Sequence, residues 1–133
     1  MPKWQLFRSS EFPTIIVDLE RISRMLEDHE DRFTDRCFTE GERSYAEESE
    51  RVRVERYAAR FAAKEAVLKA LGTGLRYGIN FTDIDVRHSS EGAPIVHLTA
   101  RAAEIAEERG ICHWHLSISH AGGFAIASAI GEG

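Results

Sequence analysis

Residues 60–74, RFAAKEAVLKALGTG, decide how this chain folds. Apolar residues recur in it at helical spacing, which predicts a long helix over about residues 52–71. A helix turns by about 100° per residue, so Glu65 lies within the apolar stripe and Lys69 lies one turn further along the same face. Gly72-Thr73-Gly74 then ends the helix, because Gly72 or Gly74 can adopt the positive φ that helix termination requires.

Glu65 is the first candidate site residue because a lone carboxylate is costly to bury unless a cation or a metal ion meets it. The alternative is a partly solvated ion pair between Glu65 and Lys69. Such a pair contributes only a few tenths of a kcal/mol. The local sequence leaves both interpretations open.

Length and composition indicate one domain with an ordinary globular core. The 133 residues fit a single domain that can bury about two thirds of its unfolded surface. We expect an irregular leader over residues 1–13 and one domain over residues 14–133. The chain has no run of about 18 apolar residues, so we expect no membrane span. It also shows no signal-peptide pattern.

Charge and cysteine content limit the function classes. The net charge of −5 argues against general nucleic-acid binding, although it allows a local basic patch. Cys37 and Cys112 lie far apart and in no metal-binding spacing. This usage argues against a disulfide scaffold and is typical of a reducing cytoplasm. We therefore expect a cytoplasmic protein.

The pattern along the chain predicts the element order β-α-α-α-β-β-α-β-β. Such an order indicates an α+β fold with helices packed on a mainly antiparallel sheet. Thr39 and Glu42 resemble a capping box that starts a charged helix. The predicted strands span residues 14–18, 81–88, 95–98, 112–120 and 124–130. One predicted helix starts at residue 19, and three others span residues 40–50, 52–71 and 100–109.

Asp18 is the second candidate because it follows the β-branched run Thr14-Ile15-Ile16-Val17, where the chain leaves the sheet. Paired in space with Glu65, it would form a hard oxygen site suited to Mg²⁺. The alternative is that Asp18 only caps the helix that starts at Leu19.

Three histidines in residues 113–120 form the third candidate. His113 and His115 share one face of a predicted strand, which can bind zinc, but a polar outer face is the favoured interpretation. No Cys or carboxylate at typical spacing completes a zinc site. His120, at the strand end, suits a ligand phosphate or a proton transfer.

Two cationic groups remain. Lys69 and the Gly72-Thr73-Gly74 turn could hold an anion, although the spacing of a Walker loop is absent. The arginines around the first helix could form a solvated face or could dock an acidic protein. They are Arg21, Arg24, Arg32 and Arg36.

Taken together, the chain resembles the 4′-phosphopantetheinyl transferases of the holo-acyl-carrier-protein synthase type over about residues 14–130. The most specific block is RFAAKEA followed by KA-GTG. The other matching segments are Val17-Asp18-Leu19 with Arg24, Arg32-Phe33-x-x-Arg36-x-Phe38-Thr39-x-x-Glu42, Phe81-x-Asp83-Ile84, Gly92-x-Pro94 and His115-x-Ser117-Ile118-Ser119-His120.

The resemblance implies an enzyme that moves the phosphopantetheine arm of coenzyme A to a serine of an apo acyl carrier protein. Adenosine 3′,5′-bisphosphate would be released. Asp18 and Glu65 would hold Mg²⁺, or Mn²⁺, and Lys69 would complete the catalytic set. The implied coenzyme A contacts are Lys64, Lys69, Gly72, Thr73, Gly74 and His120.

The resemblance also implies a carrier-binding face and a homotrimer with sites between subunits. The implied carrier-binding residues are Arg24, Arg32, Phe33 and Arg36. The fold would then be that of the phosphopantetheinyl transferases, with a role in fatty-acid biosynthesis. Two alternatives are a non-catalytic carrier-binding module on the same fold and a zinc hydrolase built on His113 and His115.

Overall fold

The computed structural model describes residues 13–133, so most of the predicted leader lies outside the described residues. The α+β prediction is confirmed. The strands are β1 (Thr14–Asp18), β2 (Ile84–His88), β3 (Pro94–Leu98), β4 (His113–Ala121) and β5 (Phe124–Glu132). The helices are α1 (Leu19–Cys37), α2 (Glu40–Glu47), α3 (Arg53–Leu71) and α4 (Ala100–Glu108), with short 3₁₀ turns at Glu50–Val52 and Phe81–Asp83.

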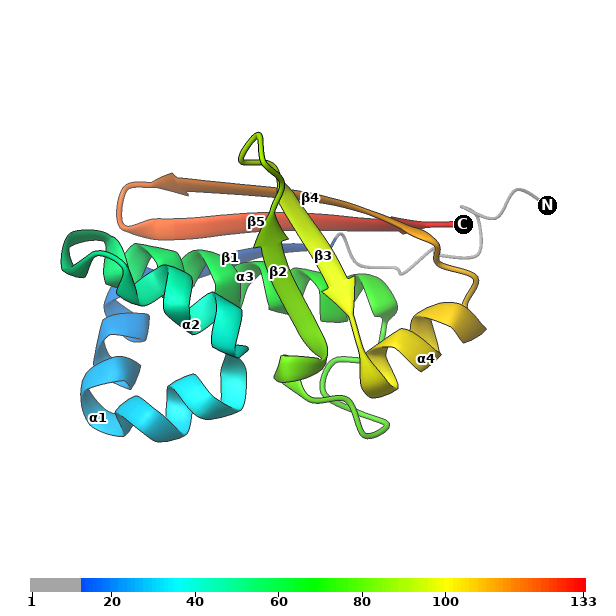
Figure 1. Ribbon diagram of the computed structural model, residues 1–133, viewed down its shortest axis with the longest axis horizontal. Helices are drawn as coiled ribbons and strands as arrows, with labels where there is room; N and C mark the ends of the chain where they lie inside the picture. The colour runs from blue at the N-terminus through cyan, green and yellow to red at the C-terminus, as the bar shows by residue number, and fades with distance from the viewer. Residues whose placement is uncertain (1–12) are drawn as a thin grey trace.

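The main sheet has three antiparallel strands in the order β1-β5-β4. The long helix α3 runs along one face of this sheet (Figure 1). Side chains alternate along β5: Ala125, Ala127 and Ala129 are buried, whereas Phe124 and Ile130 are exposed on the opposite face. One face of the sheet therefore packs on α3.

Small side chains let the helix approach the sheet closely. Ala62, Ala63 and Ala66 of α3 are completely buried, as are the inward-facing alanines of β5. A methyl group adds little thickness, so the backbones of the helix and the strand come near each other with few voids. The alanine-rich pattern in RFAAKEA is thereby explained by packing.

Helix α1 starts at Leu19, as predicted, and extends well beyond the apolar stripe of its first turns. It continues through the charged segment 29–36, with a kink at His29, where φ is −134° and ψ is 16°. The kink interrupts the apolar period, and few apolar residues mark the second half. Phe33 nevertheless packs in an aromatic cluster with Phe38 and Phe61, at ring-centroid distances of 5.4 Å and 5.9 Å.

A second, two-stranded sheet is formed by the β2–β3 hairpin, which crosses α3 in the view of Figure 1. The predicted strand 81–88 begins only at Ile84, because residues 81–83 form a 3₁₀ turn that is capped by Asn80. Within residues 13–133, no helix is both long enough and apolar enough to cross a membrane.

Candidate active site

Glu65 lies at the middle of α3 and is partly buried, with fully buried residues on both sides of it. Its carboxylate makes no hydrogen bond or ion pair with another residue of the described range. Burial raises the pKa of Glu65, and the positive charge of Arg21 lowers it in part. A half-buried carboxylate that lacks a protein partner is suited to a bound cation.

Asp18 lies at the end of β1 and is exposed. Its Oδ1 accepts a hydrogen bond of 2.9 Å from the backbone N–H of Glu20, so Asp18 is the N-cap of α1. The cap uses one carboxylate oxygen, and Oδ2 makes no hydrogen bond with a described residue. Capping and metal binding are thus compatible roles for this side chain.

The fold brings the end of β1 and the middle of α3 into the same region. Helix α3 packs on β1. The positive charge of Arg21, one turn after Asp18, lowers the pKa of the Glu65 carboxylate in part. Within residues 13–133, no group of three or more His, Cys, Asp or Glu side chains could hold a metal ion. Two carboxylates suit Mg²⁺ only when phosphate and water oxygens complete its shell.

The C-terminal end of α3 forms a turn with exposed backbone. Of the two glycines that the sequence offered, Gly72 caps the helix, with φ +77°. Thr73 is only 4% exposed, and its hydroxyl donates a hydrogen bond to the carbonyl oxygen of Gly74. A ligand can therefore reach the backbone of Gly72 and Gly74 more easily than the Thr73 side chain. Lys69 adds a cation in the last helical turn.

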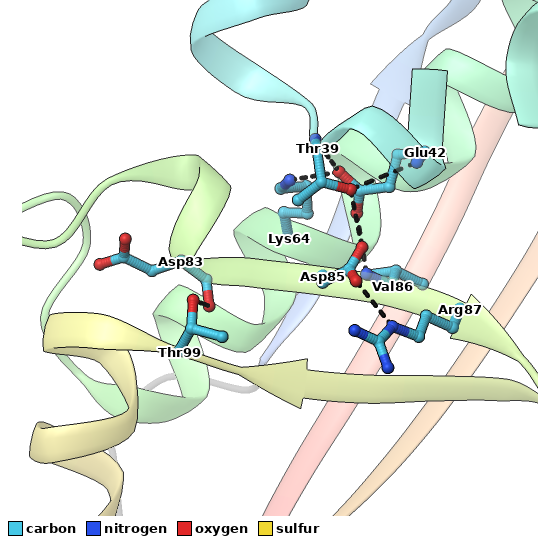
Figure 2. A network of polar contacts seen from close by, with 8 residues as sticks. All are labelled: Thr39, Glu42, Lys64, Asp83, Asp85, Val86, Arg87 and Thr99. Carbon is cyan, nitrogen blue, oxygen red and sulfur yellow. Dashed lines mark hydrogen bonds and ion pairs between the residues drawn. The ribbon is translucent and has the colours of Figure 1, made fainter. Parts of the chain in front are cut away.

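Lys64 does not face the solvent, in contrast to the role implied by the family resemblance. Its side chain is 0% exposed, and its Nζ lies 2.5 Å from Oε1 of Glu42 (Figure 2). An ammonium group that is fully enclosed and already paired is not available to a phosphate in this conformation. We therefore assign Lys64 to the protein interior and remove it from the coenzyme A contacts.

His120 lies at the other end of α3 from the glycine turn. Its Nε2 is 3.3 Å from the backbone oxygen of Glu55, in the first turn of the helix. At 1.5 Å per residue, the 17 positions from Glu55 to Gly72 correspond to about 26 Å. Within one chain, His120 and the Gly72–Gly74 turn are therefore well separated.

The three arginines of the predicted carrier-binding face are exposed on α1. These are Arg24, before the kink, and Arg32 and Arg36, after it. Phe33 is different: it is 6% exposed and belongs to the aromatic cluster of the core. A side chain this buried has little surface left for a partner, so we assign Phe33 to packing.

Arg60 was not among the sequence candidates. It is 4% exposed, and its guanidinium Nη2 lies 2.7 Å from Nε2 of His88. Arg56 and Arg60 both stack on the ring of Tyr45, at 4.1 Å and 4.6 Å, and the Nε of Arg60 donates no hydrogen bond within the described residues. Burial lowers the pKa of Arg60. The available sequence signal was an arginine five residues before Glu65 in the RFAAKEA block.

His113 and His115 lie on the exposed face of β4, as the alternating pattern predicted. Nε2 of His115 lies 2.7 Å from Oε1 of Glu132 on the neighbouring strand β5. The described residues add no further ligand that would complete a group of three. This arrangement is an exposed cross-strand pair and gives no support to the zinc hydrolase.

Comparison with known proteins identifies the family. The model of the 4′-phosphopantetheinyl transferase superfamily matches residues 16–129. The chain belongs to this superfamily. The match spans both carboxylates, the GTG turn and His120, so the candidate site lies entirely within the family region.

Individual relatives agree over most of their length. A holo-[acyl-carrier-protein] synthase of Syntrophotalea carbinolica is 44% identical over 118 residues, which is 89% of this chain and 91% of the relative. One of Koribacter versatilis is 42% identical over 88% of this chain and 93% of the relative. This family membership confirms the resemblance on which the site assignments depend.

Solved structures share the fold. The holo-[acyl-carrier-protein] synthase of Neisseria meningitidis superposes with a TM-score of 0.82 at 32% identity, over 92% of this chain and all of that one. The Helicobacter pylori enzyme, solved in complex with coenzyme A, gives a TM-score of 0.79 at 29% identity, over 90% and 97% of the two chains.

Proposed function

We propose that this protein transfers the 4′-phosphopantetheine arm of coenzyme A to a serine of an apo acyl carrier protein and releases adenosine 3′,5′-bisphosphate. The observation that carries the proposal is the half-buried Glu65, which makes no hydrogen bond or ion pair within residues 13–133 and lies on a helix that packs on β1, in a member of the transferase superfamily. The names of the relatives and the coenzyme A complex of the Helicobacter pylori enzyme support both substrates.

The charges of the site suit the reaction. Asp18 and Glu65 would hold Mg²⁺, or Mn²⁺, and such an ion would neutralise charge that develops on the coenzyme A pyrophosphate. The carrier serine oxygen forms a bond to the phosphorus that bears the pantetheine arm, and the bond from that phosphorus to the bridging oxygen breaks. Glu65, or a water molecule beside it, accepts the serine proton, and Lys69 stabilises the leaving phosphate.

The remaining groups bind the two substrates. The backbone of Gly72 and Gly74 contacts coenzyme A at one end of α3, whereas His120 supplies a polar group near the other end. The exposed arginines Arg24, Arg32 and Arg36 dock the acidic carrier. Each assignment follows the family resemblance and the exposure of the group concerned.

We further propose a homotrimer that acts in the cytoplasm in fatty-acid biosynthesis. The sheet face opposite α3 exposes the apolar residues Ile16 (66%), Phe124 (44%) and Ile130 (57%). Contact between copies through this face would bury them. The separation of His120 from the Gly72–Gly74 turn supports sites that combine groups from two subunits.

The decisive experiment is intact-mass spectrometry of an apo acyl carrier protein incubated with this protein, coenzyme A and Mg²⁺. A gain of one phosphopantetheine that EDTA abolishes is the expected result. No gain with several carriers, while the protein is folded, would favour the alternative, a non-catalytic carrier-binding module.

A further inference from the structure

The carboxylate of Glu42 joins three separate elements of the fold. Its Oε1 accepts hydrogen bonds from the backbone N–H of Thr39, at 2.8 Å, and from Lys64 Nζ, at 2.5 Å. Its Oε2 accepts one of 2.8 Å from the backbone N–H of Val86. The start of α2, the middle of α3 and strand β2 therefore meet at one side chain (Figure 2).

This is more than a helix cap. Glu42 and Thr39 form a capping box, an arrangement that needs no burial. Here, however, Glu42 is 1% exposed and Lys64 is 0% exposed. A buried ion pair is weak evidence for stability, because removing two charges from water costs about as much as their attraction returns. Its burial points to a role in fixing geometry.

Further hydrogen bonds, from Thr39 and Arg87 to Asp85, hold the capping box in place. The Thr39 hydroxyl donates a hydrogen bond of 2.7 Å to Oδ1 of Asp85, and Oδ2 of Asp85 accepts one of 2.7 Å from Arg87 Nε. The network thus contains two carboxylates and two cations. With its charges balanced and its hydrogen bonds made, such a network has one preferred arrangement.

Lys64 immediately precedes Glu65 on α3. Neighbouring side chains on a helix diverge by about 100°, so the direction of one determines the direction of the other. We propose that Glu42 is a positioning residue: by holding Lys64, it sets the rotation of α3 and aims the Glu65 carboxylate at the metal site. This inference rests on the proposed function, because it requires Glu65 to bind the metal ion.

Two variants separate positioning from stability. Glu42→Gln keeps the side-chain volume and removes the negative charge. The double variant Glu42→Gln with Lys64→Met removes both charges and fills the Lys64 cavity, a replacement that is often neutral for folding. Asp35→Asn with Arg43→Gln is the matched control, since it removes an ion pair on the surface beside α2.

The measurement is the affinity for Mn²⁺ in the presence of coenzyme A, by electron paramagnetic resonance, with thermal unfolding in parallel. We expect at least about tenfold weaker Mn²⁺ binding in both Glu42 variants, as for residues that orient metal ligands elsewhere. The control pair should bind like the unmodified protein. Wild-type affinity in either folded Glu42 variant would overturn the inference, whereas absent Mn²⁺ binding by the unmodified protein would contradict the proposed function itself.

Discussion

At the scale of single residues, the site depends on two carboxylates whose oxygens are not fully used by hydrogen bonds or ion pairs within residues 13–133. Glu65 is half-buried and unpaired among the described residues, and Asp18 uses only one carboxylate oxygen for its helix cap. Lys64 shows the opposite situation, since its charge is enclosed and matched by Glu42. Two neighbouring residues of α3 thus have different tasks, set by what each one meets in space.

Glu65→Gln is predicted to keep the fold and to lose about a hundredfold or more of the metal-dependent transfer rate. The amide has nearly the same shape but lacks the charge that binds the metal ion, whose contribution is several kcal/mol. The rate is measured by mass spectrometry of the carrier. Glu55→Gln, at an exposed position of the same helix, is the control, and normal turnover in Glu65→Gln would refute the site assignment.

Arg24→Glu is predicted to weaken carrier binding by about tenfold while leaving coenzyme A affinity unchanged. The reversed charge repels an acidic partner, and Arg24 is exposed on α1 away from the core. Calorimetric titration with each substrate separates the two affinities. An equal loss of both would mean that Arg24 has a structural role.

At the scale of elements, specific residues hold both ends of α3. Near its start, Oε1 of Glu47 on α2 accepts a hydrogen bond of 2.6 Å from Arg53 Nε, and Oε2 accepts one of 2.7 Å from the Tyr57 hydroxyl. At its end, Gly72 provides the left-handed conformation that terminates the helix. These contacts set the length of α3, and hence the distance between the groups at its two ends.

Glu47→Gln is predicted to lower the free energy of unfolding at neutral pH but not in acid. The hydrogen bond from Arg53 lowers the pKa of Glu47 most, burial opposes it, and the Tyr57 hydrogen bond lowers it further. The folded chain therefore favours the charged carboxylate. Its contribution is present above the ordinary pKa of 4.5 and is lost as the pH falls through the lower pKa of the folded state.

Urea unfolding at pH about 7 and about 3 checks this pH dependence. Glu50→Gln, an exposed residue of the neighbouring 3₁₀ turn, is the control and should change little at either pH. A loss of stability in Glu47→Gln that is the same at both pH values would show that the charge of Glu47 is not involved.

Gly72→Ala is predicted to destabilise the protein by about 1 kcal/mol, because φ is +77° and a Cβ atom disfavours this conformation. The new methyl group would also lie 3.0 Å from Nη1 of Arg109, a side chain that can move. Gly41→Ala is the contrasting control: it lies within α2 with open space around its Cα and should stabilise slightly. Urea unfolding without ligands measures both changes.

At the scale of the whole molecule, the two faces of the main sheet differ. One face is covered by α3, and the other exposes apolar side chains from β1 and β5, among them Ile16 and Ile130. Strand β4 adds a row of polar residues to this outer face, including His115 and Ser117, which pair with Ile130 and Ser128 of β5. A mixed apolar and polar face of this kind is typical of contacts between subunits.

Ile16→Lys is predicted to convert the proposed trimer into monomers, because a buried lysine without a partner destabilises the interface. Sedimentation velocity measures the state of association, and circular dichroism checks the fold. Leu75→Lys, which changes an exposed apolar residue of the loop after α3, should leave the trimer intact. A trimeric Ile16→Lys protein would place the subunit contacts elsewhere.

Much of this protein can be predicted from periodicity and end signals. The alternation of β4, the capping box of α2 and the end of α3 at Gly72 all appear in the structure as expected. The strand predicted over residues 81–88 was wrong at residues 81–83, which form a 3₁₀ turn. No local pattern predicted the kink at His29 of α1.

The sequence by itself determined the order of the elements and drew attention to Asp18 and Glu65, because hydrophobic spacing and chain ends are local properties. Only the tertiary structure decided that Lys64 is enclosed and Phe33 is packed in the core. The partners of Glu42 lie 22 and 44 residues away in the chain. Which charge meets which partner over such separations depends on how the elements pack, and no local pattern contains that information.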